Sequence, residues 1–217
     1  MLADAPPIHA EVIGHSVRQR PLRLVHVGDG SARVLVVGCV HGTERAGLPI
    51  LKALRRQAPP DGAELLLLDA ANPDGCAAGT RPNARGVDLN RNFPWGWRPL
   101  SGVYASGPKA ASEPETKAIM SLIRRARPRV TIWFHQHMDL VERTRGSDPT
   151  IISRYARSAR MRIRTLDRLP GTAPRWQEHV LPSSSAFVVE LPAGALSAVA
   201  VRRHVAAVVD VAGTVAP

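Results

Sequence analysis

Four short apolar runs, separated by helical patterns, constrain the fold of this chain more than any other feature. The runs are typical of buried β-strands and cover residues 33–38, 64–69, 130–134 and 186–191. Helical patterns occupy residues 46–57, 112–127, 150–161 and 196–209. Strands that are apolar on both faces are typical of sheets covered by helices on each side. The alternation therefore predicts an α/β fold, in which helices sandwich a mixed or largely parallel central β-sheet.

The second of these helices carries a start signal. Ser112 is expected to be its N-cap, Pro114 lies in the first turn, and Glu115 lies three residues after the serine, as in a capping box. The helix should end before Pro128.

Length and composition fit a single domain over residues 1–217. Hydrophobic residues make up 44% of the chain, which is enough for a full core. No apolar run approaches the ~18–20 residues that a membrane span requires. The first residues, MLADAPP, lack the basic and apolar segments of a secretory signal. We therefore expect a cytoplasmic protein if Met1 is the native start, and a cell-envelope or secreted one if a signal was removed.

The formal net charge of +11 describes a basic surface. The basic residues are dispersed, without the stripe and stacking aromatics of a nucleic-acid site, so the pattern argues against nucleic acid as a partner. Cys39 and Cys76 cannot form a disulfide framework. They could form one bridge, but two free thiols, with Cys39 buried in a strand, are the favoured interpretation.

Two histidine motifs follow strands and indicate a metal site. His41 and Glu44 come directly after the first strand, where an imidazole and a carboxylate can converge on zinc. The third predicted strand leads into His135 and His137, which share one strand face, so either could be the third ligand. The remaining histidines are expected to be ordinary surface or loop residues: His9, His15, His26, His179 and His204.

The segment after the second strand is a long loop, 72–108, whose length suggests a functional role. Its residues 72–94 read NPDGCAAGTRPNARGVDLNRNFP. With the two histidine motifs and the later FVVEL at 187–191, this stretch closely resembles the zinc carboxypeptidase family. The resemblance covers about two-thirds of the chain and implies that family's phosphorylase/hydrolase-like fold.

The resemblance also implies a role for each matching residue. His41, Glu44 and His135 would hold one zinc ion per chain, and Glu190 would be the general base. Arg81 would polarise the scissile carbonyl, while Asn90 and Arg91 would bind the terminal carboxylate of the substrate. These roles agree with the chemistry, because zinc acidifies water and a planar guanidinium matches a carboxylate with two hydrogen bonds.

Two departures separate the chain from the digestive members of the family. Residues 165–176 contain no tyrosine, although those enzymes carry a mobile one in this region. The segment 170–177 instead resembles the bacterial murein peptide amidase branch. The specificity-pocket residue is expected near 173–175, which makes Arg175 a candidate substrate contact, and His137 is expected to contact substrate rather than metal.

We therefore expect zinc-dependent hydrolysis of an amide bond next to a free carboxylate, with a murein peptide as substrate, for example at the D-glutamyl–diaminopimelate link. One alternative is a small-molecule deacylase of the aspartoacylase or succinylglutamate desuccinylase type, which shares the His-x-x-Glu and Asp-Leu-Asn-Arg elements. Another is a non-catalytic basic module that binds cell wall or nucleic acid on a dead peptidase fold. Such modules usually lose a ligand or the base, and neither is lost here.

Overall fold

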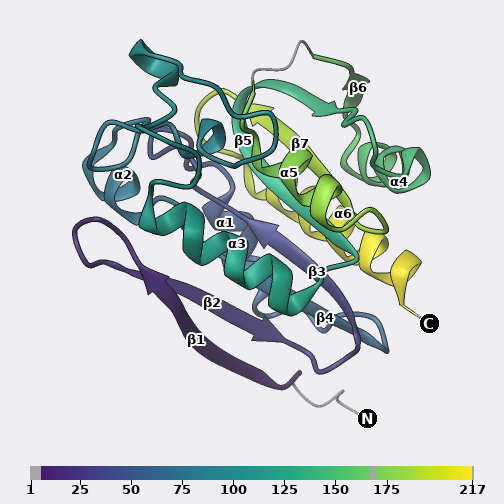
Figure 1. Ribbon diagram of the computed structural model, residues 1–217. Coiled ribbons are helices and arrows are strands. Elements are labelled where there is room, and N and C mark those ends of the chain that lie inside the picture. The colour runs from purple at the N-terminus through teal and green to yellow at the C-terminus, as the bar shows by residue number, and fades with distance from the viewer. Residues whose placement is uncertain (1–5, 167–169, 217) are drawn as a thin grey trace.

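A seven-stranded mixed sheet forms the centre of the computed structural model, which describes residues 6–166 and 170–216 (Figure 1). Its order is β1-β2-β4-β3-β5-β6, and β7 also pairs with β5. The strands β3, β4, β5, β6 and β7 are parallel where they pair, whereas β1 and β2 run antiparallel to their neighbours. The strands are β1 (Ile8–His15), β2 (Pro21–Val27), β3 (Ala32–Val37), β4 (Ala63–Leu68), β5 (Val130–Glu142), β6 (Arg162–Arg164) and β7 (Ser185–Pro192).

Helices cover both faces of this sheet. Along β3, Val34 and Val36 belong to the core that contains α1, α4 and α6, whereas Leu35 and Val37 belong to the core that contains α3 and α5. In Figure 1, α3 lies in front of the sheet and α6 behind it. This arrangement confirms the predicted α/β sandwich. The helices are α1 (Leu48–Leu54), α2 (Pro73–Ala78), α3 (Pro114–Ala126), α4 (Pro149–Ala159), α5 (Ala173–Val180) and α6 (Ala198–Val215), with 3-10 turns η1 (Leu89–Arg91) and η2 (Gly102–Tyr104).

Several element predictions need correction. The β1–β2 hairpin, α2, α5 and β6 were not predicted. The edge strand β1 is mostly exposed and gives no apolar run. The strand β5 continues to Glu142, so His135 and His137 lie within the strand rather than at its end. Cys39 is buried as expected, but it lies beyond β3, with a positive φ of 46°. Both cysteines are free.

The predicted cap of α3 is also wrong. The helix begins at Pro114, so the N-cap is Glu113, and the Ser112 hydroxyl donates to the Glu113 carboxylate over 2.7 Å and accepts from Asn92. The Glu115 carboxylate does not close a capping box. It accepts a hydrogen bond from the backbone N–H of Val17 (3.1 Å), which ties α3 to the β1–β2 connection.

Two of the histidines expected on the surface have structural roles. His26 pairs with Glu64 at 2.7 Å. His204 of α6 is only 4% exposed, and its Nδ1 lies 2.8 Å from the hydroxyl of Tyr155 on α4. Histidine can be buried on this apolar helix face because its ring nitrogen forms a hydrogen bond with the phenol of the neighbouring helix. Burial, together with the charge of Arg203, lowers the pKa of His204 to about 4.

This histidine should make the fold sensitive to acid. Below the ordinary histidine pKa of about 6.5, His204 binds a proton in the unfolded chain but stays neutral in the folded protein. The free energy of unfolding therefore falls as the pH falls, until the pH reaches about 4. The loss should total about 3 kcal/mol. The variant His204→Gln keeps a polar partner for Tyr155 but does not titrate. Between pH 6.5 and 4, we expect its free energy of unfolding to fall by about 3 kcal/mol less than that of the native protein, as measured in urea denaturation series. Parallel stability curves for the two proteins would contradict this assignment.

Within the described residues, no helix combines the length and apolar content that crossing a bilayer demands.

Candidate active site

The loop after β3 carries the first two predicted metal ligands and is pressed against α2. A Cβ atom at Gly42 would lie 1.9 Å from the carbonyl carbon of Gly75, so only glycine fits this close approach. On the α2 side, the Asn72 side chain caps the helix by accepting a hydrogen bond from the Gly75 N–H over 2.8 Å. The motif at 72–75 thus fixes the backbone between His41 and Glu44.

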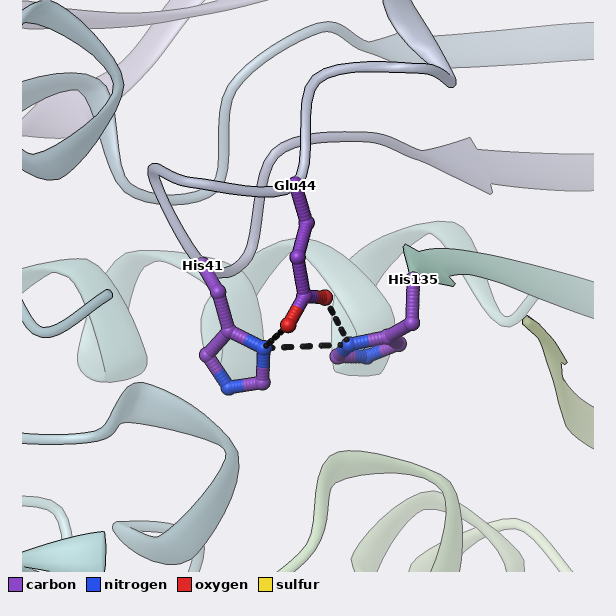
Figure 2. A group of neighbouring side chains, drawn as sticks. All are labelled: His41, Glu44 and His135. Carbon is purple, nitrogen blue, oxygen red and sulfur yellow. Dashed lines mark hydrogen bonds and ion pairs between the residues drawn. The ribbon is translucent and has the colours of Figure 1, made fainter. Parts of the chain in front are cut away.

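His41 and Glu44, in the loop after β3, and His135, within β5, point toward one another (Figure 2). Their candidate ligand atoms all lie within 4.8 Å of one another. The Nδ1 atoms of the two histidines are 3.2 Å apart, and the Glu44 carboxylate lies 2.9 Å from each of them. Two imidazole nitrogens and one carboxylate are a donor set that catalytic zinc sites use with one position left open. The three side chains therefore fit a zinc ion.

Asp88 supports this cluster from behind, a role that the sequence analysis did not assign. Its Oδ1 lies 2.9 Å from His41 Nε2, so it orients the ring whose Nδ1 faces Glu44. Its Oδ2 accepts from Arg81 Nη2 at 2.9 Å, and Arg81 Nη1 donates to Glu44 at 3.1 Å. The only sequence signal for this role was its place in the motif, directly before Leu89 and Asn90.

Hydrogen bonding outweighs burial in setting the charge of these groups. Burial alone would lower the pKa of His41, but hydrogen bonds to Asp88 and Glu44 raise it above its usual value. Burial alone would raise the pKa of Glu44, but hydrogen bonds from His135 and His41 hold it well below its usual range. The Asp88 pKa is likewise held low against burial by His41. Both carboxylates are thus ionised at neutral pH, which suits a cation site.

Glu190 lies directly beside His135, because the β5–β7 register pairs these two residues. Its Oε2 atom is buried and has no hydrogen-bond partner among the residues that the structure describes. A buried carboxylate oxygen without a partner is costly unless a ligand or water completes it. The atom is therefore suited to accept a proton or hydrogen bond from something bound in the cavity.

All nine residues predicted for the site line one cavity of about 410 Å³. The Asn90 carboxamide oxygen accepts from the Ala173 N–H over 2.9 Å, which joins the 3-10 turn η1 to the start of α5. Arg91 Nη1 donates to the Asn90 carbonyl, while its buried Nε has no partner within residues 6–166 and 170–216. His137 lines the cavity but does not belong to the ligand cluster. The nine are His41, Glu44, Arg81, Asn90, Arg91, His135, His137, Arg175 and Glu190.

Sequence reasoning missed other lining residues, among them Tyr104, Glu142 and Thr144. Glu142 and Thr144 lie on or just after the unpredicted extension of β5, and Tyr104 lies in the long loop. None of them stands in a motif that marks chemistry.

Comparison with known proteins decides the family. Residues 2–170 match the family model for zinc carboxypeptidases. The chain belongs to the zinc carboxypeptidase family. This confirms the resemblance inferred from the motifs and, with the His–Glu–His donor set, identifies zinc as the cofactor of the site.

Individual members of the family resemble this chain in sequence or in structure. Murein peptide amidase A of Escherichia coli (strain K12) is 35% identical over 128 residues, which cover 52% of this chain and 53% of the relative. The crystal structure of murein-tripeptide amidase from Escherichia coli O157 has a TM-score of 0.77 at 28% identity, over 95% of this chain and 92% of that one. Carboxypeptidase A from Helicoverpa armigera also reaches 0.77, at 20% identity over 96% and 68% of the two chains, which shows the fold alone. The chain spans about half the length of the curated relatives it matches.

Proposed function

We propose that this chain is a zinc-dependent peptide amidase that hydrolyses an amide bond next to a free carboxylate in murein peptides. One observation carries the proposal. A zinc-type donor set, a buried carboxylate with an oxygen that no described residue hydrogen-bonds, and the guanidinium groups of Arg81, Arg91 and Arg175 all line one cavity of about 410 Å³. The murein substrate class is supported by the names of the relatives that match at 28–35% identity.

Each side chain has a role that its surroundings support. His41, Glu44 and His135 would hold the zinc ion, which would supply a Lewis acid and lower the pKa of water. Glu190 accepts a proton from the attacking water and delivers it to the leaving nitrogen. Arg81 stabilises the charge that develops on the carbonyl oxygen. Arg91, whose Nε has no partner in the described part of the chain, binds the free carboxylate together with Asn90.

Neither alternative function has a specific observation in its favour. A dead peptidase fold would lack a metal ligand or the base, whereas His41, Glu44, His135 and Glu190 all face the cavity. A deacylase would use the same metal donors, so substrate preference must separate it from a peptide amidase.

The direct test is digestion of isolated muropeptides by the zinc-loaded protein, with the fragments identified by mass. We expect cleavage of the bond that links D-glutamate to diaminopimelate in a free tripeptide. A panel of N-acyl amino acids at the same concentration is the comparison, and chelator-treated protein is the control. Rapid hydrolysis of N-acyl amino acids with intact muropeptides would replace this proposal by the deacylase alternative.

A further inference from the structure

Tyr104 is an aromatic residue of the cavity wall that no motif predicts. It ends the 3-10 turn η2, lines the cavity and is 42% exposed. Its ring centroid lies 5.5 Å from Cζ of Arg81 and 5.4 Å from Cζ of Arg91. One ring therefore contacts both guanidinium groups that the proposed function assigns to the carbonyl and carboxylate of the substrate.

The backbone on either side fixes where this ring lies. The Ala105 carbonyl accepts a hydrogen bond from the Asp88 N–H over 2.8 Å. The next residue, Ser106, is fully buried, and its carbonyl accepts from Asn92 Nδ2 at 2.8 Å and from Trp97 Nε1 at 3.1 Å. These bonds attach the loop to the same segment that carries Asn90 and Arg91, so Tyr104 is held beside the arginines rather than on a free loop.

The two arginines have unequal support without the ring. Arg81 has Asp88 and Glu44 as partners. For the Arg91 side chain, the described residues provide one hydrogen-bond acceptor, the backbone carbonyl of Asn90, which accepts from Nη1. Its Nε is buried and has no partner among these residues. Burial lowers the pKa of Arg91, the charge of Arg81 lowers it too, and Asp88 and Tyr104 act in the opposite direction. An aromatic face is a suitable neighbour for two like charges, because its quadrupole attracts cations without forming an ion pair that a substrate must displace.

We propose that Tyr104 is a positioning residue that holds the guanidinium group of Arg91 in the geometry a substrate carboxylate requires, while Glu44 and Asp88 hold Arg81 in place without the ring. This inference rests on the proposed function of the same site. It assigns the effect to the ring rather than to the phenol hydroxyl. Tyr104→Phe should therefore behave like the native protein, and Tyr104→Ala should not.

Kinetics on a matched substrate pair would test this role. The pair is a murein tripeptide with its free carboxylate next to the cleaved bond and the same peptide with that group as a carboxamide. We expect Tyr104→Ala to raise KM for the carboxylate peptide about five- to tenfold, and to leave kcat/KM for the carboxamide within about twofold. Tyr104→Phe should stay within about threefold on both. Val103→Ala, in the same turn and 68% exposed, is the matched control and should equal the native protein.

A second readout does not depend on turnover. In NMR spectra of the zinc-loaded protein, the Nε–H resonances of Arg81 and Arg91 should shift in Tyr104→Ala, which removes the ring current, and stay near their native positions in Tyr104→Phe. Unshifted resonances in Tyr104→Ala would overturn the inference, as would equal kinetic losses on both peptides or a Phe variant as impaired as the Ala variant. If the native protein cleaved neither peptide, the proposed function would be wrong. The NMR comparison would still test whether the Tyr104 ring lies against the two arginines.

Discussion

Replacing Glu190 with glutamine should slow turnover at least ~10²-fold while the protein stays folded and loaded with zinc. Glutamine keeps the size of the side chain but cannot accept a proton from water or return one to the leaving nitrogen. No described residue hydrogen-bonds the Oε2 atom of Glu190, so the substitution breaks no contact that the structure shows at that atom. The neighbouring His135 is fixed by the β5–β7 register and by Glu44, which leaves the metal ligands in place.

The measurements are turnover on muropeptides, zinc content and melting temperature of the same preparations. Glu64→Gln is the matched control, because Glu64 is a buried carboxylate on β4 that bonds Arg33 at 2.8 Å and His26 at 2.7 Å, outside the cavity. A structural carboxylate of this kind should lower the melting temperature and leave turnover per folded molecule unchanged. If the Glu190 variant hydrolyses a good substrate within a fewfold of the native rate, Glu190 is not the general base.

The part of the site that was predictable from sequence depends on strand ends and local motifs. His41 and Glu44 could be brought together with a histidine of the third predicted strand because buried parallel strands deliver side chains to one edge of the sheet. The strand pattern left His135 and His137 open as the third ligand, and only the resemblance to zinc carboxypeptidases selected His135. Asn90, Arg91 and Arg81 have no such strand, and only the resemblance to zinc carboxypeptidases placed them. The α/β sandwich was predictable because its buried strands are short apolar runs, which can be recognised from neighbouring residues in the sequence alone.

The features that were missed depend on contacts between distant segments. Tyr104 reaches the cavity because Ala105 and Ser106 bond to the segment 88–92, which no periodicity reveals. His204 is buried because Tyr155 satisfies it across 49 residues of sequence. Residues 136–139 of β5 do not form an apolar run, so the sequence does not mark them as a buried strand. The strand continues beyond His135 because it pairs with β7 and β6.

Substitution of any one of the three donors should remove stoichiometric zinc and the activity with it. We expect about one zinc per chain in the native protein and little in His41→Ala, Glu44→Ala or His135→Ala, because a catalytic site with two remaining protein ligands binds zinc weakly. Zinc content of dialysed protein and activity after zinc is restored are the measurements. Zinc at about one hundred times its dissociation constant adds about 2.7 kcal/mol to the stability of a folded site, so chelation should also lower the melting temperature.

His137→Ala is the matched control for these three variants. His137 lies two residues after His135 on β5 and lines the same cavity, but its side chain lies outside the donor cluster. This variant should therefore keep most of its zinc, and any loss of activity should fall on substrate binding. The assignment rests on which histidine of β5 faces Glu44, and His135 Nδ1 does so at 2.9 Å. A zinc-free His137→Ala protein beside a zinc-loaded His135→Ala protein would show that the third ligand is His137, and that β5 turns its other histidine toward the metal in solution.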